Sequence, residues 1–117
     1  MFGLSRRLRR SRPAAPAWIE AETLSRRLSG DTPPLILDVR TGEEFVGPLG
    51  HIAGAVNIPM TELPTRVPEL ARQMGTIVTV CKTDRRSAAA AAQLCAAGAV
   101  DVAVLRGGME RWHALGL

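Results

Sequence analysis

The chain has 117 residues, 46% of them hydrophobic, which suits one domain with a single core, and its 3% aromatic content means that aliphatic side chains must build that core. No apolar run approaches the ~20 residues that a transmembrane helix requires, so no membrane span is expected. Five arginines and no acid in residues 1–12 account for the net charge of +4, and the nearly neutral remainder lacks the broad basic face of a nucleic-acid-binding domain.

Residues 1–17 form a basic, proline-containing segment that we expect to be a disordered tail, with the folded domain over residues 18–117. The run Ser5-Arg6-Arg7 resembles the start of a twin-arginine export signal, but Arg10, Arg12 and two prolines interrupt the apolar stretch that must follow. A short transit peptide and a weak contact with anionic lipid or RNA are the alternatives for this segment. Because the export pattern is incomplete, we expect a cytoplasmic protein.

The remaining chain alternates between short apolar runs and helical patterns. Strands are expected over residues 35–39, 55–58, 76–80 and 100–105, and helices over residues 19–28, 62–74 (broken at Pro64 and Pro68), 87–97 and 108–115. Thr41 followed three residues later by Glu44 matches a capping box, so a short helix is expected to start there. Strands separated by helices predict an α/β fold of three layers, with a parallel central sheet and helices on both faces.

Cys81 is the most informative residue, because it closes the expected strand over residues 76–80 and opens a loop that leads into an alanine-rich helix. Loops of this kind are where open α/β sheets bind ligands. Nearby cations and a helix N-terminus favour the thiolate, which is the nucleophilic form of cysteine. We therefore predict that Cys81 is a catalytic nucleophile. The predicted anion-binding loop comprises Lys82, Thr83, Asp84, Arg85, Arg86 and Ser87.

The second cysteine, Cys95, falls within the alanine-rich helical stretch, where a small buried thiol is expected. A resolving cysteine that forms a disulfide with Cys81 is the alternative. The two cysteines, His51 and His113 do not follow a metal-ligand spacing, so we expect no metal site, and nothing in the sequence implies a cofactor.

Three further segments accompany the Cys81 loop. They are Asp38-Val39-Arg40 at the end of an apolar run, the stretch Gly50-His51-Ile52-Ala53-Gly54-Ala55-Val56-Asn57-Ile58-Pro59, and the stretch Leu105-Arg106-Gly107-Gly108-Met109-Glu110-Arg111-Trp112. In this order and spacing, the four segments resemble the rhodanese (sulfurtransferase) family over about residues 18–115. The resemblance implies that a sulfane sulfur moves from a small anionic donor such as thiosulfate to Cys81, as a persulfide, and then to a thiol or cyanide acceptor. A sulfur-carrier protein is a further partner that the resemblance allows.

The resemblance also implies roles for the charged residues. Asp38 and Arg40 are expected to support the active loop through ion pairs and hydrogen bonds, and Lys82 is expected to bind the donor. Arg86 matches the arginine that ends the family's six-residue loop. For Arg85 two alternatives stay open: the side chain is only solvated, or it binds the substrate. For Glu44 we favour the helix cap over a partnership with an arginine.

Other residues are expected to support the fold. His51 is expected to make a structural hydrogen bond rather than to carry a proton, and Trp112 is expected in the core. Gly107 and Gly108 are expected to allow a close backbone approach before the last helix.

Asp84 departs from the family pattern, since many members have glycine at this position. Aspartate tolerates a left-handed backbone better than most residues, so the loop is still expected to curl around the thiol. Its carboxylate either pairs with Arg85 or Arg86 or repels an anionic donor, and the sequence leaves both outcomes open.

Two other functions compete with sulfur transfer. A phosphatase or arsenate reductase of the same general fold has a loop that is one residue longer, Cys-x5-Arg, whereas this chain has Cys81-x4-Arg86 and a serine at position 87. A non-catalytic rhodanese-like binding module is the second alternative, although such modules usually lack the cysteine that this chain retains.

Overall fold

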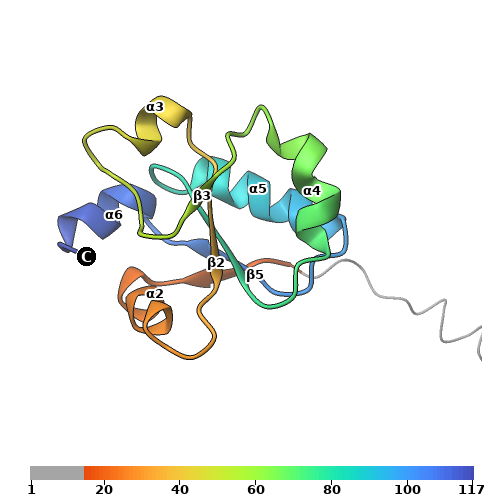
Figure 1. The fold of residues 1–117 in the computed structure, drawn as a ribbon, viewed down its shortest axis with the longest axis horizontal. Helices are drawn as coiled ribbons and strands as arrows, with labels where there is room; N and C mark the ends of the chain where they lie inside the picture. Colours follow the sequence, from red (N-terminus) through yellow and green to blue (C-terminus); the bar gives the residue numbers. More distant parts are fainter. Residues whose placement is uncertain (1–14) are drawn as a thin grey trace, which may run out of the picture.

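The computed structural model describes residues 15–117, so residues 1–14 of the expected tail lie outside the described part. The strands β1 (Ala17–Ile19), β2 (Leu35–Asp38), β3 (Val56–Asn57), β4 (Ile77–Val80) and β5 (Val102–Leu105) form one sheet. Its order is β1-β5-β4-β2-β3, and every neighbouring pair is parallel. The helices are α2 (Ala21–Leu28), α3 (Gly42–Phe45), α4 (Leu63–Ala71), α5 (Arg85–Ala96) and α6 (Gly108–Ala114), as Figure 1 shows.

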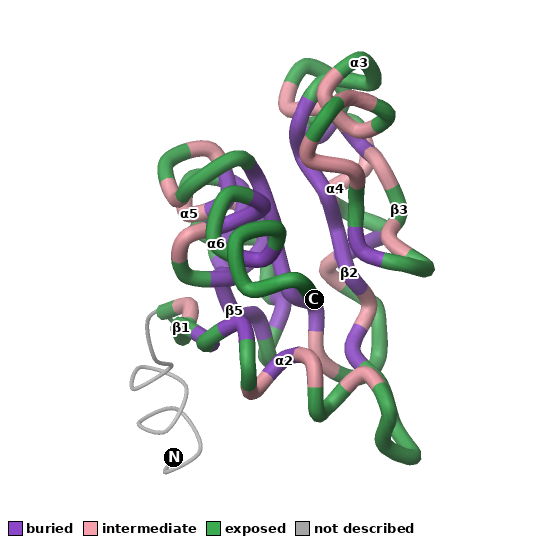
Figure 2. Tube along the Cα trace, turned by 90° about the vertical axis from the view of Figure 1, so that its left-hand side faces the viewer, coloured by how far each residue is buried: buried purple, intermediate pink, exposed green. Residues whose placement is uncertain are grey.

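Helices cover both faces of the sheet. One cluster of buried side chains joins α4 and α5 to residues such as Leu37 and Ile77, and a second joins α2 and α6 to residues such as Ile36 and Val78. Adjacent residues of one strand therefore serve opposite faces, as the pleat requires, and in Figure 2 the central strands are drawn mostly as buried. This arrangement confirms the predicted three-layer α/β/α fold.

The structure adds one strand that the sequence analysis missed. Ala17, which was expected in the tail, is the first residue of β1, and Ile19, which was expected in a helix, is its last. The strand pairs with β5, and the Arg106 amide donates to the Ile19 carbonyl at 2.9 Å. Because the strand is short and its partner lies more than 80 residues away, no local pattern marks it. Helix α2 begins only at Ala21.

The expected break in the helix over residues 62–74 is also wrong, because α4 is a single helix despite two prolines. Pro64 lies in the first turn, where an amide would have no partner within the helix. Pro68 is inside the helix, where it lacks the amide that would have donated toward residue 64. No helix of the described residues is long and apolar enough to cross a membrane.

The topology gathers the predicted functional segments at one edge. Strand β4 lies at the centre of the sheet beside β2, with Asp38 opposite Val80 in register. The amide of Val39 donates to the Val80 carbonyl at 2.9 Å, just before Cys81. Since the strands are parallel, the segments that follow β2, β4 and β5 all leave the sheet at its carboxyl edge.

Candidate active site

The thiol of Cys81 lies inside its loop, with 1% of the residue exposed. Its sulfur Sγ accepts a hydrogen bond from the Ser87 amide at 3.3 Å and lies 3.2 Å from the Ser87 hydroxyl, to which the thiol donates. That hydroxyl donates to the Asp84 carbonyl at 3.1 Å, and the Ser87 carbonyl accepts from Thr79 at 2.9 Å. Ser87 is thus fixed on both sides and presents an amide and a hydroxyl to the sulfur.

Helix α5 begins at Arg85, two residues earlier than predicted, so both loop arginines belong to its first turn. The positive end of the helix dipole therefore lies beside the Cys81 sulfur, where it stabilises negative charge. Arg85 is exposed and has no ion-pair partner among residues 15–117. Thr83 is exposed as well.

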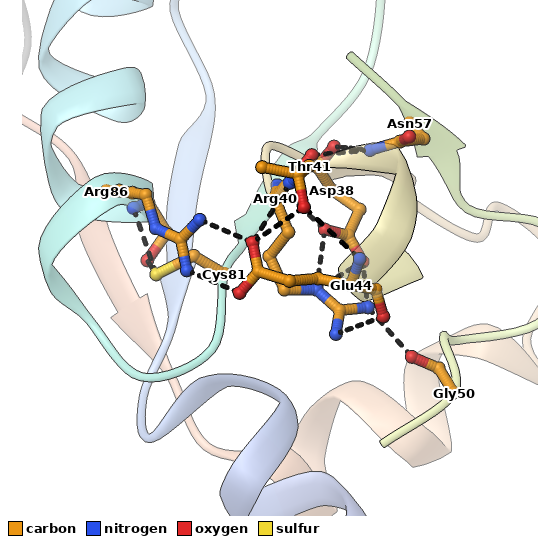
Figure 3. Close-up of polar contacts among 9 residues, drawn as sticks. Asp38, Arg40, Thr41, Glu44, Gly50, Asn57, Cys81 and Arg86 are labelled. Atoms are coloured by element: carbon orange, nitrogen blue, oxygen red, sulfur yellow. Dashed lines mark hydrogen bonds and ion pairs between the residues drawn. The ribbon is translucent and has the colours of Figure 1, made fainter. Parts of the chain in front are cut away.

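Arg86 is held by a carboxylate from a different part of the chain. Its nitrogens Nη1 and Nη2 donate to Glu44 Oε1 and Oε2 at 2.7 and 2.9 Å, as Figure 3 shows. Glu44 Oε1 also accepts from the Thr41 amide at 3.0 Å, which completes the predicted capping box. The sequence favours the cap over an arginine partnership, whereas in the structure Glu44 is both cap and arginine partner.

This pair shifts the ionisation of both groups. The Arg86 hydrogen bond, supported by those from Thr41 and opposed by burial, lowers the pKa of Glu44 from 4.5 to about 2. The hydrogen bond to Glu44 in turn raises the pKa of Arg86, against the opposing effect of burial, and the negative charge of Glu44 adds to the rise. Both groups therefore stay charged across the physiological pH range.

Asp38 and Arg40 form a buried ion pair, in which Arg40 Nη2 lies 2.7 Å from Asp38 Oδ2 and each side chain is 1% exposed. Arg40 also donates to the carbonyls of Glu44 at 3.1 Å and Gly50 at 2.8 Å. The Asn57 amide group donates to the backbone carbonyls of Asp38 and Arg40 at 3.0 and 2.9 Å. The pair thus positions the segment that carries Glu44, and its support reaches the Cys81 loop through the contact between Glu44 and Arg86.

Helix α6 supports the loop from the other side. The amides of Met109 and Glu110 donate to the carbonyls of Cys81 at 2.9 Å and Lys82 at 3.0 Å. Gly108, with φ of +55°, lies so close that a Cβ there would collide with the carbonyls of Cys81, Lys82 and Thr83. The predicted close backbone approach is therefore confirmed, and its partner is the Cys81 loop.

Asp84 forms no ion pair with Arg85 or Arg86. Its Oδ1 accepts from the Gly107 amide at 2.8 Å, which links the loop to the start of α6. Its φ of −132° lies outside the left-handed region, so aspartate occupies the position without the strain that glycine would relieve. Of the two outcomes left open by the sequence, pairing with Arg85 or Arg86 is wrong.

A cavity of about 410 Å³ lies beside the loop. Its lining residues are Arg40, Glu44, Pro48, Leu49, Lys82 and Glu110. Lys82 Nζ is 3.8 Å from Glu110 Oε2, so the predicted donor-binding lysine has a carboxylate beside it. Glu110 and Asn57 are not predicted as site residues from the sequence, because their roles depend on contacts between distant segments.

The remaining candidates have structural surroundings. His51 Nδ1 shares a hydrogen bond with the Phe45 carbonyl at 2.8 Å, and its ring stacks on Phe45 with centroids 3.7 Å apart, as expected for a structural histidine. Cys95 is buried and free, and burial raises the pKa of its thiol. Trp112 is in the core, as predicted. Among residues 15–117, no cluster of three or more metal-ligating side chains is found.

The sequence model of the Rhodanese-like domain family matches residues 20–115. The chain belongs to this family. It is 35% identical to a sulfurtransferase of Allochromatium vinosum over 85% of this chain and 90% of that protein. A rhodanese-related protein of Thermoplasma volcanium is similar in structure, with a TM-score of 0.73 and 30% identity over 86% of this chain and 93% of that one. The rhodanese-like domain thus occupies nearly all of the described residues.

Two relatives from Bacillus subtilis are longer than the aligned region. One is uncharacterized, 38% identical over 66% of this chain, and the chain covers 59% of it. The other is named a putative sulfur carrier protein, 34% identical over 80% of this chain, and the chain covers 49% of it. The similarity to these two proteins is therefore limited to the rhodanese-like domain and does not include their remaining parts.

Proposed function

We propose that this protein is a sulfurtransferase that carries a sulfane sulfur as a persulfide on Cys81. The observation that carries the proposal is the position of Sγ at the first turn of α5, where it accepts from the Ser87 amide. The Cys81 thiolate attacks the outer sulfur of a donor, a Cys81 S–S bond forms, and the donor's own bond to that sulfur breaks. With thiosulfate the leaving group is sulfite. A thiol or cyanide then attacks the outer sulfur and regenerates the thiolate.

The loop residues have distinct roles in this proposal. The Ser87 amide and the α5 dipole stabilise the charge on the sulfur, as backbone donors do in anion cradles. When the thiol ionises, the Ser87 hydroxyl turns its proton from the Asp84 carbonyl toward Sγ, since it lies 3.2 Å away. Arg86, held by Glu44, keeps a fixed positive charge beside the sulfur. Lys82, which lines the cavity beside the loop, contacts the incoming donor, and exposed Arg85 stays in solvent.

The acceptor of the sulfur can also be a protein. The relative named a putative sulfur carrier protein motivates the proposal that a sulfur-carrier protein exchanges sulfur with Cys81. The cytoplasmic location stays a prediction from the sequence.

The two competing functions have less support. The loop Cys81-x4-Arg86 is shorter than that of the related phosphatases and arsenate reductases. A non-catalytic binding module would have no need for the contacts that Ser87 makes to the sulfur.

The test is the rate of sulfur transfer from several donors to cyanide, with phosphate-ester hydrolysis measured beside it. Cys81→Ser should abolish sulfur transfer while the protein remains folded, and Cys95→Ser should retain it. Equal loss in both variants would indicate a redox mechanism that uses both cysteines. Ester hydrolysis without sulfur transfer would favour the phosphatase.

A further inference from the structure

The charges around the cavity beside the Cys81 loop are compensated in pairs. Two cations and two carboxylates line it, with two apolar residues, Pro48 and Leu49, in the same wall. The guanidinium of Arg40 is neutralised by buried Asp38. Lys82 faces Glu110 at 3.8 Å. The cavity therefore offers an incoming molecule no excess positive charge.

The loop's own arginines do not change this balance. Arg86 is bound through both terminal nitrogens to Glu44, whose carboxylate also lines the cavity. Arg85 is exposed and is not among the residues that line the cavity. The amide of Ser87 and the N-terminus of α5 remain as donors at Sγ, and together they suit the single charge of a persulfide.

Thiosulfate places two negative charges beside the Cys81 thiolate. Each cation in the cavity wall is already paired with a carboxylate, so the second charge of thiosulfate would leave water without gaining a free cation in return. The cavity is also larger than a small inorganic anion needs, and its apolar residues would touch an organic group but gain nothing from an oxyanion. Charge and size thus point to the same kind of donor.

We infer that the cavity selects organic donors with one negative charge on the terminal sulfur, such as persulfides or thiosulfonates, over the thiosulfate dianion. The inference rests on the proposed sulfur transfer at Cys81. A persulfide R–S–S⁻ gives its outer sulfur to the Cys81 thiolate and leaves as the thiolate R–S⁻. A thiosulfonate R–SO₂–S⁻ gives the same sulfur and leaves as the sulfinate R–SO₂⁻. The group R lies against Pro48 and Leu49.

The experiment compares thiosulfate, methanethiosulfonate and benzenethiosulfonate as donors, with cyanide as the acceptor. Each kcat/KM is divided by the rate of the same donor with free cysteine, which removes the difference in intrinsic reactivity. We expect benzenethiosulfonate to exceed thiosulfate at least tenfold, with methanethiosulfonate between them. Thiosulfate at parity or faster would overturn the inference and leave the proposed function intact. If no donor loads sulfur on the folded protein, the proposed function itself fails.

Variants separate charge from size. Glu110→Gln should raise kcat/KM for thiosulfate about three- to tenfold, an increase that shrinks at high salt, and should leave benzenethiosulfonate within about twofold. Glu69→Gln is the matched control, since Glu69 is exposed to a similar degree, 58% against 53%, and is paired with Arg66 on α4. Leu49→Ala should reduce the ratio of kcat/KM for benzenethiosulfonate to kcat/KM for methanethiosulfonate, because it removes apolar surface from the cavity. An unchanged thiosulfate rate in Glu110→Gln would contradict the charge argument.

Discussion

Replacing Glu44 by glutamine tests the ion pair that holds Arg86 beside the reactive sulfur. Glutamine keeps the shape and one acceptor for the Thr41 amide, but it loses the charge and one of the two bonds to Arg86. The pKa of Glu44 falls from 4.5 to about 2 in the folded protein. At about 1.4 kcal/mol per pKa unit, this shift sets an upper bound of about 3.5 kcal/mol on the contribution of Glu44 to the free energy of unfolding. Because Arg86 and Glu44 are 36% and 32% exposed, solvent reduces the expected loss to about 1–2 kcal/mol at neutral pH.

The pH dependence has a definite sign. A carboxylate with a lowered folded-state pKa contributes its full stability above the unfolded value of 4.5, and that stability is lost as the pH falls toward 2. The difference in unfolding free energy between wild type and Glu44→Gln, measured with urea between pH 7 and pH 3, should therefore be largest at neutral pH and shrink as the pH falls below 4.5. Glu43→Gln is the control, because Glu43 is exposed on the same helix and makes no ion pair among the described residues. A difference between wild type and Glu44→Gln that does not change with pH would refute this account.

Three further predictions concern the packing around the loop. Gly108→Ala should lower the free energy of unfolding by about 3 kcal/mol or more, because the new Cβ would collide with three carbonyls. Gly116→Ala is the control: Gly116 also has a positive φ, +73°, but lies in open space, so the loss should be only about 1 kcal/mol. Similar losses in the two variants would mean that the backbone conformation alone matters. Asp84→Ala should lower the free energy of unfolding by about 1–2 kcal/mol and slow sulfur transfer, because the Gly107 amide loses its acceptor. Asp84→Asn keeps an acceptor for that amide, so its loss of unfolding free energy should be less than half as large. Arg40→Met should cost about 3–5 kcal/mol by thermal or urea unfolding, since it leaves a buried carboxylate unpaired, and a loss below 1 kcal/mol would contradict the buried pair.

The parts of the fold that the sequence predicts are those with a local signal. The apolar runs of β2, β4 and β5 and the capping box of α3 can each be recognised within a few neighbouring residues. The position of Cys81 between an apolar strand and an alanine-rich helix is local as well. Strand β1 depends on pairing with β5 at the far end of the chain, so it has no such signal.

The same distinction applies to the site. The order of the loop from Cys81 to Ser87 is visible in the sequence, but its supports come from other segments. Arg86 meets a carboxylate 42 positions away, and Asp84 meets an amide 23 positions away. Such contacts depend on how the carboxyl edge of the sheet brings loops together, and single-sequence patterns do not encode that geometry.

The measurement that tests the central claim most directly is mass spectrometry of the whole protein after exposure to a sulfane donor, followed by peptide mapping. The account predicts a gain of one sulfur atom at Cys81, reversed by cyanide and absent in Cys81→Ser. Sulfur at Cys95 instead, or a disulfide between the two cysteines without any added sulfur, would contradict it.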